Sequence, residues 1–279
     1  MSPTEKSRLL LQRTMSALGP YRDEAILIGG MAKTFYRQVP GFRDQGIVPQ
    51  ATLDVDLAVP EPLLLREAVS LHARLEAHGL RRYVTIDLDR RPAAHRYHLA
   101  EDGVERPAAV HLEFVVPLHG PERDTPGHPQ ADLLASALRF IDLLQALPVT
   151  ITDPDLGSLR LAHPLTYAIQ KTRIGSARRH GKAERDLADA FYVLTGFHAE
   201  WASWRMVWEQ LCADRHTWAQ WLATTNARWW ELYGTDLTPR CRTVAQIVGM
   251  DPRRVQRVMM DFLEQVCPGR PADPGRRCD

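Results

Sequence analysis

Two aspartates stand two residues apart in the segment ATLDVDLAVP, residues 51–60. Apolar residues alternate with Asp54 and Asp56, a period that predicts a β-strand with one apolar face. Side chains two residues apart on a strand point to the same face, so the two carboxylates are expected to lie side by side. Two like charges on one face repel unless a cation neutralises them. Mg²⁺ suits this place because it takes carboxylate oxygens together with substrate phosphates and water.

A third carboxylate stands in the segment AAVHLEFVVPL, residues 108–118, which is predicted to form another strand. Glu113 lies there between Leu112 and Phe114, and on a neighbouring strand it would complete a metal site with Asp54 and Asp56. An alternative is that Glu113 belongs to a solvated strand face and that Asp56 caps the following turn. Taken singly, each carboxylate fits this alternative as well, so another feature has to decide.

That feature is a pair of glycines, Gly29 and Gly30, in the segment AILIGGMAKTFYRQ. A short apolar strand is predicted to end there and to run directly into a helix. Glycines at such a turn allow the backbone to approach a ligand closely, and helix N-terminal N–H groups are suited to phosphate. A phosphate-binding turn followed by a metal-binding strand supplies both parts that phosphoryl transfer requires.

The elements that position these residues form a mixed α/β region over residues 20–120. Its apolar runs predict strands near residues 24–30, 53–59, 81–88, 94–100 and 108–118. Helical spacing predicts an amphipathic helix within residues 63–80, after an N-terminal helix that ends at Gly19 and Pro20. Residues 119–130 are predicted to be a loop, and residues 147–152 an edge strand.

The chain becomes helical from about residue 160. Two helices are predicted over residues 163–177 and 182–196, joined by a basic turn. The tryptophans at 201, 204 and 208 share one helix face, which favours a helical-bundle core over a cofactor site or stacking platform. We therefore predict an α/β domain over residues 1–155, a helical domain over residues 156–266 and a disordered tail over residues 267–279.

The bulk composition excludes some classes of protein. The formal net charge of +1 gives no overall electrostatic footprint for nucleic acid. No apolar run is long enough to span a membrane, and the N-terminus lacks the pattern of a signal peptide, so a cytoplasmic protein is expected. The cysteines are too widely spaced to predict a zinc site or disulfides. They are Cys212, Cys241, Cys267 and Cys278.

These motifs together resemble the nucleotidyltransferase superfamily that includes DNA polymerase beta, and within it the AbiEii-type proteins. The segments IGGMAKTFY, TLDVDLAV and HLEFVV match the glycine motif, the T-x-D-x-D motif and the third-carboxylate strand. The helical segment that follows, with a lysine and a D-x-x-D pattern, is also similar. The resemblance covers roughly residues 20–195 and implies an α+β fold. It consists of a nucleotidyltransferase-type mixed β-sheet domain with flanking helices, followed by a helical C-terminal domain.

The resemblance also implies a reaction, which is transfer of a nucleoside monophosphate from an NTP to an acceptor hydroxyl. Mg²⁺, or alternatively Mn²⁺, is the implied cofactor. The acceptor would be an RNA such as tRNA, or a protein, and the biological role that of a toxin with a cognate antitoxin or of phage defence. No membrane is involved.

The resemblance assigns roles to individual residues of this chain. Gly29 and Gly30 would hold the triphosphate, Asp54 and Asp56 would bind the metal, and Glu113 would be a metal ligand or the base for the attacking hydroxyl. Lys171 would reach the triphosphate, and Asp186 and Asp189 would lie near the nucleotide. Without the resemblance, Lys171 is better explained as a surface lysine, and the Asp186/Asp189 pair as acidic residues near a helix N-terminus. These eight are the predicted site residues.

Two departures from the family pattern affect this interpretation. Gly-Gly stands where the family often has Gly-Ser, so a hydroxyl contact to phosphate is missing. Residues 31–53 form an interval about twice the length that the resemblance implies, with the extra length within residues 38–52. This insertion is either a lid over the nucleotide or a tolerated loop, and the second is the expectation.

Two other functions stay open. The first is a catalytically inactive nucleotidyltransferase-like module that binds a nucleotide or a protein, which the missing serine favours. The second is a DNA-binding regulator that uses residues 240–266, where a helix, a glycine-containing turn and a second helix are predicted. The basic run between Arg173 and Arg185 is either a phosphate-binding surface or a solvated helix face.

Overall fold

The computed structural model describes residues 1–49, 52, 54–86, 92–102, 110–118, 126–177, 181–234, 236–267 and 269. The chain forms two compact units. The sheet unit comprises Met1–Val39 and Gln50–His163, and the helical unit comprises Pro40–Pro49 and Pro164–Asp279. The second unit therefore takes in a short piece of the chain that the sequence places inside the first.

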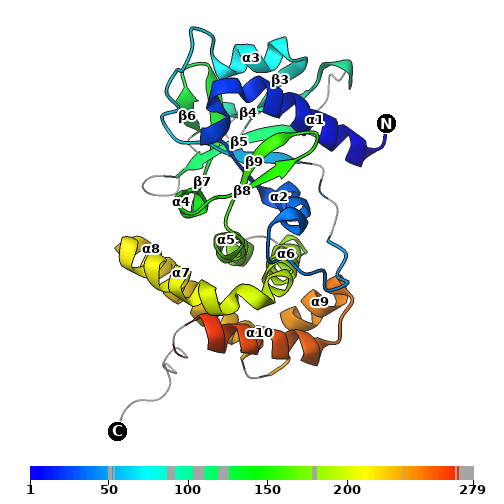
Figure 1. The fold of residues 1–279 in the computed structure, drawn as a ribbon, viewed down its shortest axis with the longest axis vertical. Coiled ribbons are helices and arrows are strands. Elements are labelled where there is room, and N and C mark those ends of the chain that lie inside the picture. The colour runs from blue at the N-terminus through cyan, green and yellow to red at the C-terminus, as the bar shows by residue number, and fades with distance from the viewer. Residues whose placement is uncertain are drawn as a thin grey trace. The chain divides into compact units, whose positions relative to one another are not determined.

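The sheet unit combines short helices with nine described strands (Figure 1). The strands are β1 Ile26–Ile28, β2 Val55–Ala58, β3 Leu80–Ile86, β4 Pro92–Leu99, β5 Leu112–Pro117, β6 Gly127–Gln130, β7 Leu133–Leu138, β8 Val149–Asp153 and β9 Gly157–Leu161. The α-helices are α1 Pro3–Leu18, α2 Gly29–Phe35, α3 Leu71–Ala77 and α4 Ile141–Ala146. The 3₁₀ helices are η1 Gly19–Glu24, η2 Tyr36–Gln38 and η3 Ala100–Asp102.

The described strands form one mixed sheet in the order β3-β4-β5-β2-β1-β9-β8, and β7 pairs with both β5 and β6. β2 and β5 run parallel, whereas β1 and β4 are antiparallel to β2 and β5 respectively. The predicted α+β class with a mixed sheet, flanking helices and a helical C-terminal part is confirmed. The central strands β1, β2 and β5 are largely buried, which explains their apolar sequences.

The helix boundaries of the sheet unit follow local capping. Ser2 and Glu5 form a capping box at the start of α1, and Gly19 ends it where the sequence predicts. The predicted helix within residues 63–80 is shorter in the structure, because α3 begins only after Ser70, whose hydroxyl accepts a hydrogen bond from the Ala73 N–H.

The helical unit consists of two long helices followed by a bundle. Its elements are α5 Pro164–Ala177, α6 Lys182–Gly196, η4 His198–Glu200, α7 Trp201–Asp214, α8 His216–Tyr233, α9 Pro239–Val248 and α10 Pro252–Val266. Helix α5 packs on α6, and α7, α8 and α10 pack on one another (Figure 1). Trp201, Trp204 and Trp208 are each at most 5% exposed, which confirms the predicted core stripe. None of the described helices combines the length and apolar character needed to cross a membrane.

The structure bears on three expectations about the organisation of the chain. Part of the predicted loop 119–130 is strand β6, because Gly127 and Gln130 pair with β7; residues 119–125 lie outside the described residues. The unit boundary falls after His163 rather than at residue 155, since β8 and β9 pair with each other and β9 pairs with β1. The predicted tail, including Cys278, lies outside the described residues except for Cys267 and Gly269.

Candidate functional site

A row of polar side chains crosses one face of the sheet. The strand register pairs Ile28 of β1 with Asp56 of β2, Asp56 with Glu113 of β5, and Glu113 with Arg96 of β4. Paired residues of neighbouring strands project from the same face, so the carboxylates of Asp56 and Glu113 share that face with the Arg96 guanidinium. The sheet thus brings together residues that are far apart in the sequence.

Asp54 precedes β2 and lies two residues before Asp56 along the chain. Its side chain is 47% exposed, and its Oδ1 atom lies 3.1 Å from Nδ1 of His111. His111 is 12% exposed and directly precedes β5, and its Nε2 atom lies 3.9 Å from Oε2 of Glu113. His111 therefore stands between the Asp54 and Glu113 carboxylates.

The glycine turn lies directly against the aspartate strand. Gly29 has a φ of +67°, and a Cβ atom at this position would fall 1.9 Å from Oδ2 of Asp56. A Cβ atom on Gly30 would fall 2.7 Å from Oγ1 of Thr52, the threonine of the T-x-D-x-D motif. Gly29 is therefore favoured by its backbone conformation, and a Cβ atom on Gly30 would press against the short, branched side chain of Thr52. The structure places Gly29 and Gly30 beside the predicted metal-binding strand.

Glu113 is held by three groups that the sequence analysis did not identify. Its Oε2 atom lies 3.0 Å from Nε of Arg96, and its Oε1 atom accepts a hydrogen bond from the Ser136 hydroxyl. His111 is the third group, and the Glu113 side chain is only 13% exposed. No local pattern marks Arg96 or Ser136, because their partnership with Glu113 depends on the pairing of β5 with β4 and β7.

Tyr83 of β3 extends the row beyond Arg96, with which it pairs. Burial raises the pKa of the Tyr83 phenol, although the nearby Arg96 charge partly opposes the shift. Tyr83 therefore stays protonated at neutral pH. The row then runs from a neutral phenol through a guanidinium to the carboxylates.

The carboxylates of this face decide what kind of divalent-cation site it can form. Within the described residues, which include all three carboxylates, no group of three or more His, Cys, Asp and Glu side chains is arranged to hold a metal. Glu113 is instead engaged by Arg96 and Ser136. Mg²⁺ commonly binds through one or two carboxylates with substrate phosphates and water completing its shell. The donor chemistry of Asp54 and Asp56, beside a glycine turn, fits this two-carboxylate type.

The remaining predicted residues meet one another in the helical unit. Nζ of Lys171 on α5 lies 2.7 Å from Oδ1 of Asp186 and 3.6 Å from Oδ2 of Asp189, both on α6. All three residues are at most 9% exposed. Their mutual pairing accounts for their burial without a ligand, and their role at a nucleotide stays a prediction.

The structure describes the basic run between Arg173 and Arg185 in part and the C-terminal helix pair completely. Lys182 and Arg185 are exposed at the start of α6, whereas residues 178–180 of the basic run lie outside the described residues. The predicted helix pair near the C-terminus is confirmed as α9 and α10, with Gly249 in the left-handed conformation between them. Whether this pair binds DNA stays a prediction.

Sequence comparison agrees with the geometry of the sheet unit. A family model described as Nucleotidyltransferase matches residues 9–211, most of the chain. The chain belongs to the nucleotidyltransferase family. Membership supports a transferase of this general kind with an NTP substrate. No significant match was found among curated proteins.

Proposed function

We propose that this nucleotidyltransferase transfers a nucleoside monophosphate from an NTP to an acceptor hydroxyl in a Mg²⁺-dependent reaction. The observation that carries the proposal is the contact between the glycine turn and the aspartate strand, where Gly29 leaves no room for a Cβ atom beside Asp56. A phosphate held at the turn would lie next to carboxylates that prefer a hard cation. Two carboxylates and substrate phosphates together make the shell that Mg²⁺ favours.

In this proposal, Asp54 and Asp56 hold the cation, and Mn²⁺ would fit the same oxygen ligands. A bound Mg²⁺ ion would polarise the α-phosphate and offset the charge that develops on it. Gly29 and Gly30 bind the triphosphate through backbone N–H groups, a role for which they need no side chain. The serine hydroxyl that is missing from this turn is therefore not required for binding.

Glu113 is proposed to act as a positioned carboxylate on the same face. Arg96 and Ser136 fix both of its oxygen atoms, and this arrangement supports a role near the attacking hydroxyl more than a role as an outer metal ligand. His111 lies between the carboxylates of Asp54 and Glu113 and fixes their relative positions. Preorganised groups of this kind cost little reorganisation during the reaction.

The finer biological assignments are proposals that rest on the resemblance alone. They are an AbiEii-type toxin or phage-defence role, an RNA or protein acceptor, a cognate antitoxin and a cytoplasmic location. Inducing the wild-type protein and the Asp54→Ala/Asp56→Ala protein in a bacterial host tests the toxin role. Growth arrest with the wild type alone is the expected result.

The reaction itself is tested by incubating the purified chain with Mg²⁺, each α-³²P-labelled NTP, total RNA and cell extract. The expected result is label transfer by the wild type and none by the Asp54→Ala/Asp56→Ala protein. A matched control is Asp23→Ala/Asp155→Ala, which removes two exposed carboxylates elsewhere in the sheet unit and should retain transfer.

Other outcomes separate the alternatives. Mg²⁺-dependent NTP binding without transfer to any acceptor would favour the inactive nucleotide-binding module. Absence of both metal and nucleotide binding would overturn the proposal. Treatment with EDTA, followed by restoration with Mg²⁺ or Mn²⁺, tests the cofactor independently of the substitutions.

A further inference from the structure

The polar row of the sheet continues past Glu113, away from the proposed metal site. The strand order is β3-β4-β5-β2-β1, so Glu113 of β5 separates the aspartate strand β2 from Arg96 of β4 and Tyr83 of β3. Neighbouring strands lie about 4.8 Å apart, which places the Arg96 backbone about 10 Å from that of Asp56. All four residues belong to the sheet unit, so this part of the face is complete within one compact body.

The glycine turn lies on the other side of the aspartate strand. Gly29 follows β1, and β1 pairs with the edge of β2 that does not face β5. A triphosphate bound at the turn, as proposed above, would lie on the β1 side of the aspartates, and its pyrophosphate would leave there. The attacking and leaving oxygens of phosphoryl transfer are roughly in line, so the acceptor hydroxyl has to approach from the side of Glu113. The next group that an acceptor meets along this face is Arg96.

The Arg96 side chain is fixed, and part of it is accessible to a ligand. Its Nε atom lies 3.0 Å from Oε2 of Glu113, and the side chain is 33% exposed, compared with 13% for Glu113. Among the described residues, Glu113 is the only acid with which Arg96 forms an ion pair. A guanidinium carries five N–H donors in a planar fork, so the terminal nitrogens of Arg96 keep donors for a ligand. Such a fork suits phosphate because it can bind two oxygen atoms at once.

Two buried polar atoms beside Arg96 form no hydrogen bond of normal geometry in the part of the chain that the structure describes. They are the Tyr83 hydroxyl oxygen and Nδ1 of His98. Tyr83 pairs with Arg96 across β3 and β4, and its ring centroid lies 5.7 Å from that of His98. His98 stands two residues from Arg96 on β4 and therefore shares its face. Because buried polar groups normally have partners, these two atoms favour a polar ligand next to Arg96.

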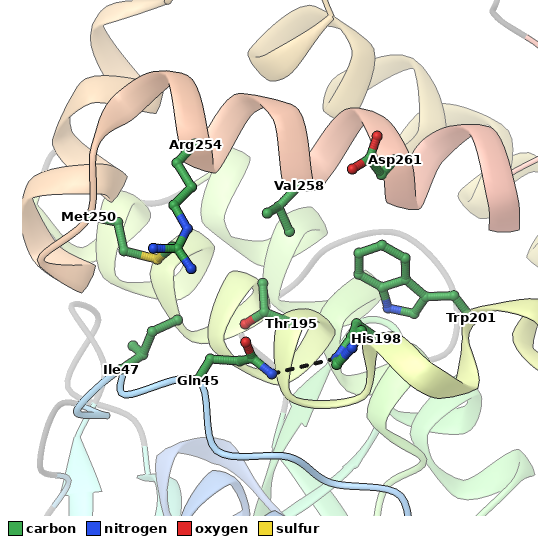
Figure 2. A pocket seen from close by; sticks show the side chains of 9 residues that line it. All are labelled: Gln45, Ile47, Thr195, His198, Trp201, Met250, Arg254, Val258 and Asp261. Atoms are coloured by element: carbon green, nitrogen blue, oxygen red, sulfur yellow. Dashed lines mark hydrogen bonds between the residues drawn. The ribbon is translucent and has the colours of Figure 1, made fainter.

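This place differs from the pocket of about 180 Å³ in the helical unit (Figure 2). That pocket is lined in part by the Pro40–Pro49 segment, in which Phe42 packs over Gly196. Its aromatic wall, Trp201, belongs to the bundle core, and its charged side chains are exposed. Charges on a solvated rim select a ligand weakly. At the sheet face, in contrast, the guanidinium is held at the proposed reaction centre.

We infer that Arg96 binds a phosphate of the acceptor, so that the acceptor hydroxyl belongs to a phosphorylated sugar. The inference rests on the proposed function, in which Glu113 lies at the attacking hydroxyl. In the transfer, the acceptor oxygen bonds to the α-phosphorus, the bond from that phosphorus to the pyrophosphate oxygen breaks, and the hydroxyl proton passes to Glu113. A nucleotide carries its hydroxyl and its phosphate on one sugar, which matches a carboxylate and a guanidinium in direct contact. The Tyr83 hydroxyl is then a partner for the sugar.

This chemistry separates the acceptors that the proposed function leaves open. A phosphorylated sugar with a free hydroxyl occurs at the 3′ end of a nucleic acid strand and in a free nucleotide. A serine or tyrosine side chain of a protein brings a hydroxyl but no phosphate of its own. Arg96 therefore favours a nucleotide acceptor over a protein acceptor.

Binding of RNA without NTP or metal tests the phosphate contact separately from the reaction. The probe is a 5′-fluorescein RNA hexamer of mixed sequence, whose fluorescence anisotropy is followed as the full chain is added. A second hexamer carries a neutral methylphosphonate at its last linkage, next to the 3′-terminal sugar, and a third carries it at the first linkage. For the wild type, neutralising the last linkage should weaken binding about tenfold, and neutralising the first linkage should weaken it less than about twofold.

A substitution assigns the contact to Arg96. Arg96→Gln should bind the unmodified hexamer about tenfold more weakly and should lose the preference for a charged last linkage. Arg82→Gln removes an exposed arginine from the opposite face of β3 and should keep the wild-type affinities. A residue that only supported Glu113 would leave the linkage preference unchanged. If Arg96→Gln does not fold, the comparison of the three hexamers with the wild type still tests the inference.

Kinetics give a second readout in the transfer assay. Arg96→Gln should raise KM for the RNA acceptor about tenfold and leave KM for the NTP unchanged, because the triphosphate is bound on the other side of the aspartates. An increase in KM for the NTP alone would place Arg96 at the triphosphate and overturn the inference.

Calorimetric titration with mixed nucleoside 5′-monophosphates, and with the corresponding nucleosides, identifies the source. Tighter binding of the hexamer than of the monophosphates assigns the acceptor to the end of a strand. The reverse order, with monophosphates bound more tightly than nucleosides, assigns it to a free nucleotide.

The outcomes separate this inference from the proposed function. A preference for a charged last linkage without transfer from any NTP would uphold the phosphate contact at Arg96 and overturn the proposed reaction. Transfer of label to protein and not to RNA or nucleotide would uphold the reaction and overturn the inference. The inference is also overturned if the wild type prefers neither the charged last linkage nor monophosphates over nucleosides, or if Arg96→Gln keeps the wild-type preference.

Discussion

The two units of this protein place carboxylates in opposite environments. In the sheet unit, Asp54 is 47% exposed and is approached by a histidine. In the helical unit, Asp186 and Asp189 are buried around Lys171. A carboxylate at a surface can exchange water for a cation, whereas a buried carboxylate needs a resident partner. In the proposed function, the same residue type therefore serves a reaction in the sheet unit, whereas in the helical unit it belongs to a buried ion-pair cluster.

This comparison predicts that Asp56→Asn abolishes function without unfolding the protein. Loss of a carboxylate from the proposed metal site should lower nucleotide transfer by on the order of a thousandfold. The variant should stay folded, because asparagine keeps the shape of the aspartate side chain. Transfer assays and thermal denaturation measure the two effects. Retained transfer would remove Asp56 from the metal site.

Lys171→Met should show the opposite behaviour, with a loss of stability of about 3–5 kcal/mol, because two carboxylates are left buried without their cation. All seven tryptophans lie between residues 201 and 230, so their fluorescence follows unfolding of the helical unit. Lys182→Met, at an exposed position on α6, is the matched control, with an expected change within about 0.5 kcal/mol. Loss of NTP binding at unchanged stability would instead place Lys171 at the triphosphate.

Acid should destabilise the sheet unit through His95. Burial lowers the pKa of His95 from 6.5 to about 4, and its Nδ1 accepts a hydrogen bond from the Leu134 N–H. The unfolded chain binds this proton more readily, so the contribution to stability is complete above pH 6.5 and is lost as pH falls towards 4. The loss is at most about 3 kcal/mol.

Circular dichroism and tryptophan fluorescence during urea unfolding separate the two units in this acid experiment. The sheet unit should unfold at a lower urea concentration at pH 4 than at pH 7, and His95→Gln should reduce this pH dependence. His78→Gln, at an exposed position of the same unit that does not contribute to the pKa shift of His95, is the control and should leave the dependence unchanged. If the His95→Gln protein unfolds with the same pH dependence as the wild type, His95 is not the source of the acid sensitivity.

Arg96→Gln tests Glu113, whose exposure lies between that of Asp54 and that of the buried aspartates of the helical unit. Glu113 is mostly buried and would keep Ser136 and His111 but lose its guanidinium partner. The expected loss of stability is about 1–2 kcal/mol, the cost of a missing charged hydrogen bond. Urea unfolding of Arg81→Gln, which removes an exposed arginine from β3, gives the reference. An equal effect of both substitutions would mean that Arg96 does not support Glu113.

The sequence alone was sufficient for features that depend on local pattern. The alternation around Asp54 and Asp56, the strand-to-helix glycines and the helix boundaries of α5 and α6 all follow from short-range periodicity and capping. The tryptophan core was predictable for the same reason, because three residues at helical spacing define one face. Each of these signals spans only a short stretch of the chain.

The tertiary structure alone decided which distant residues became partners. The engagement of Glu113 by Arg96 and Ser136 follows from strand pairing, which no local pattern specifies. The burial of Lys171 with Asp186 and Asp189 depends on how α5 packs on α6, and the assignment of Pro40–Pro49 to the helical unit depends on Phe42 and Gly196. Local propensity fixes an element, but the environment of a charge is set by the elements that pack around it.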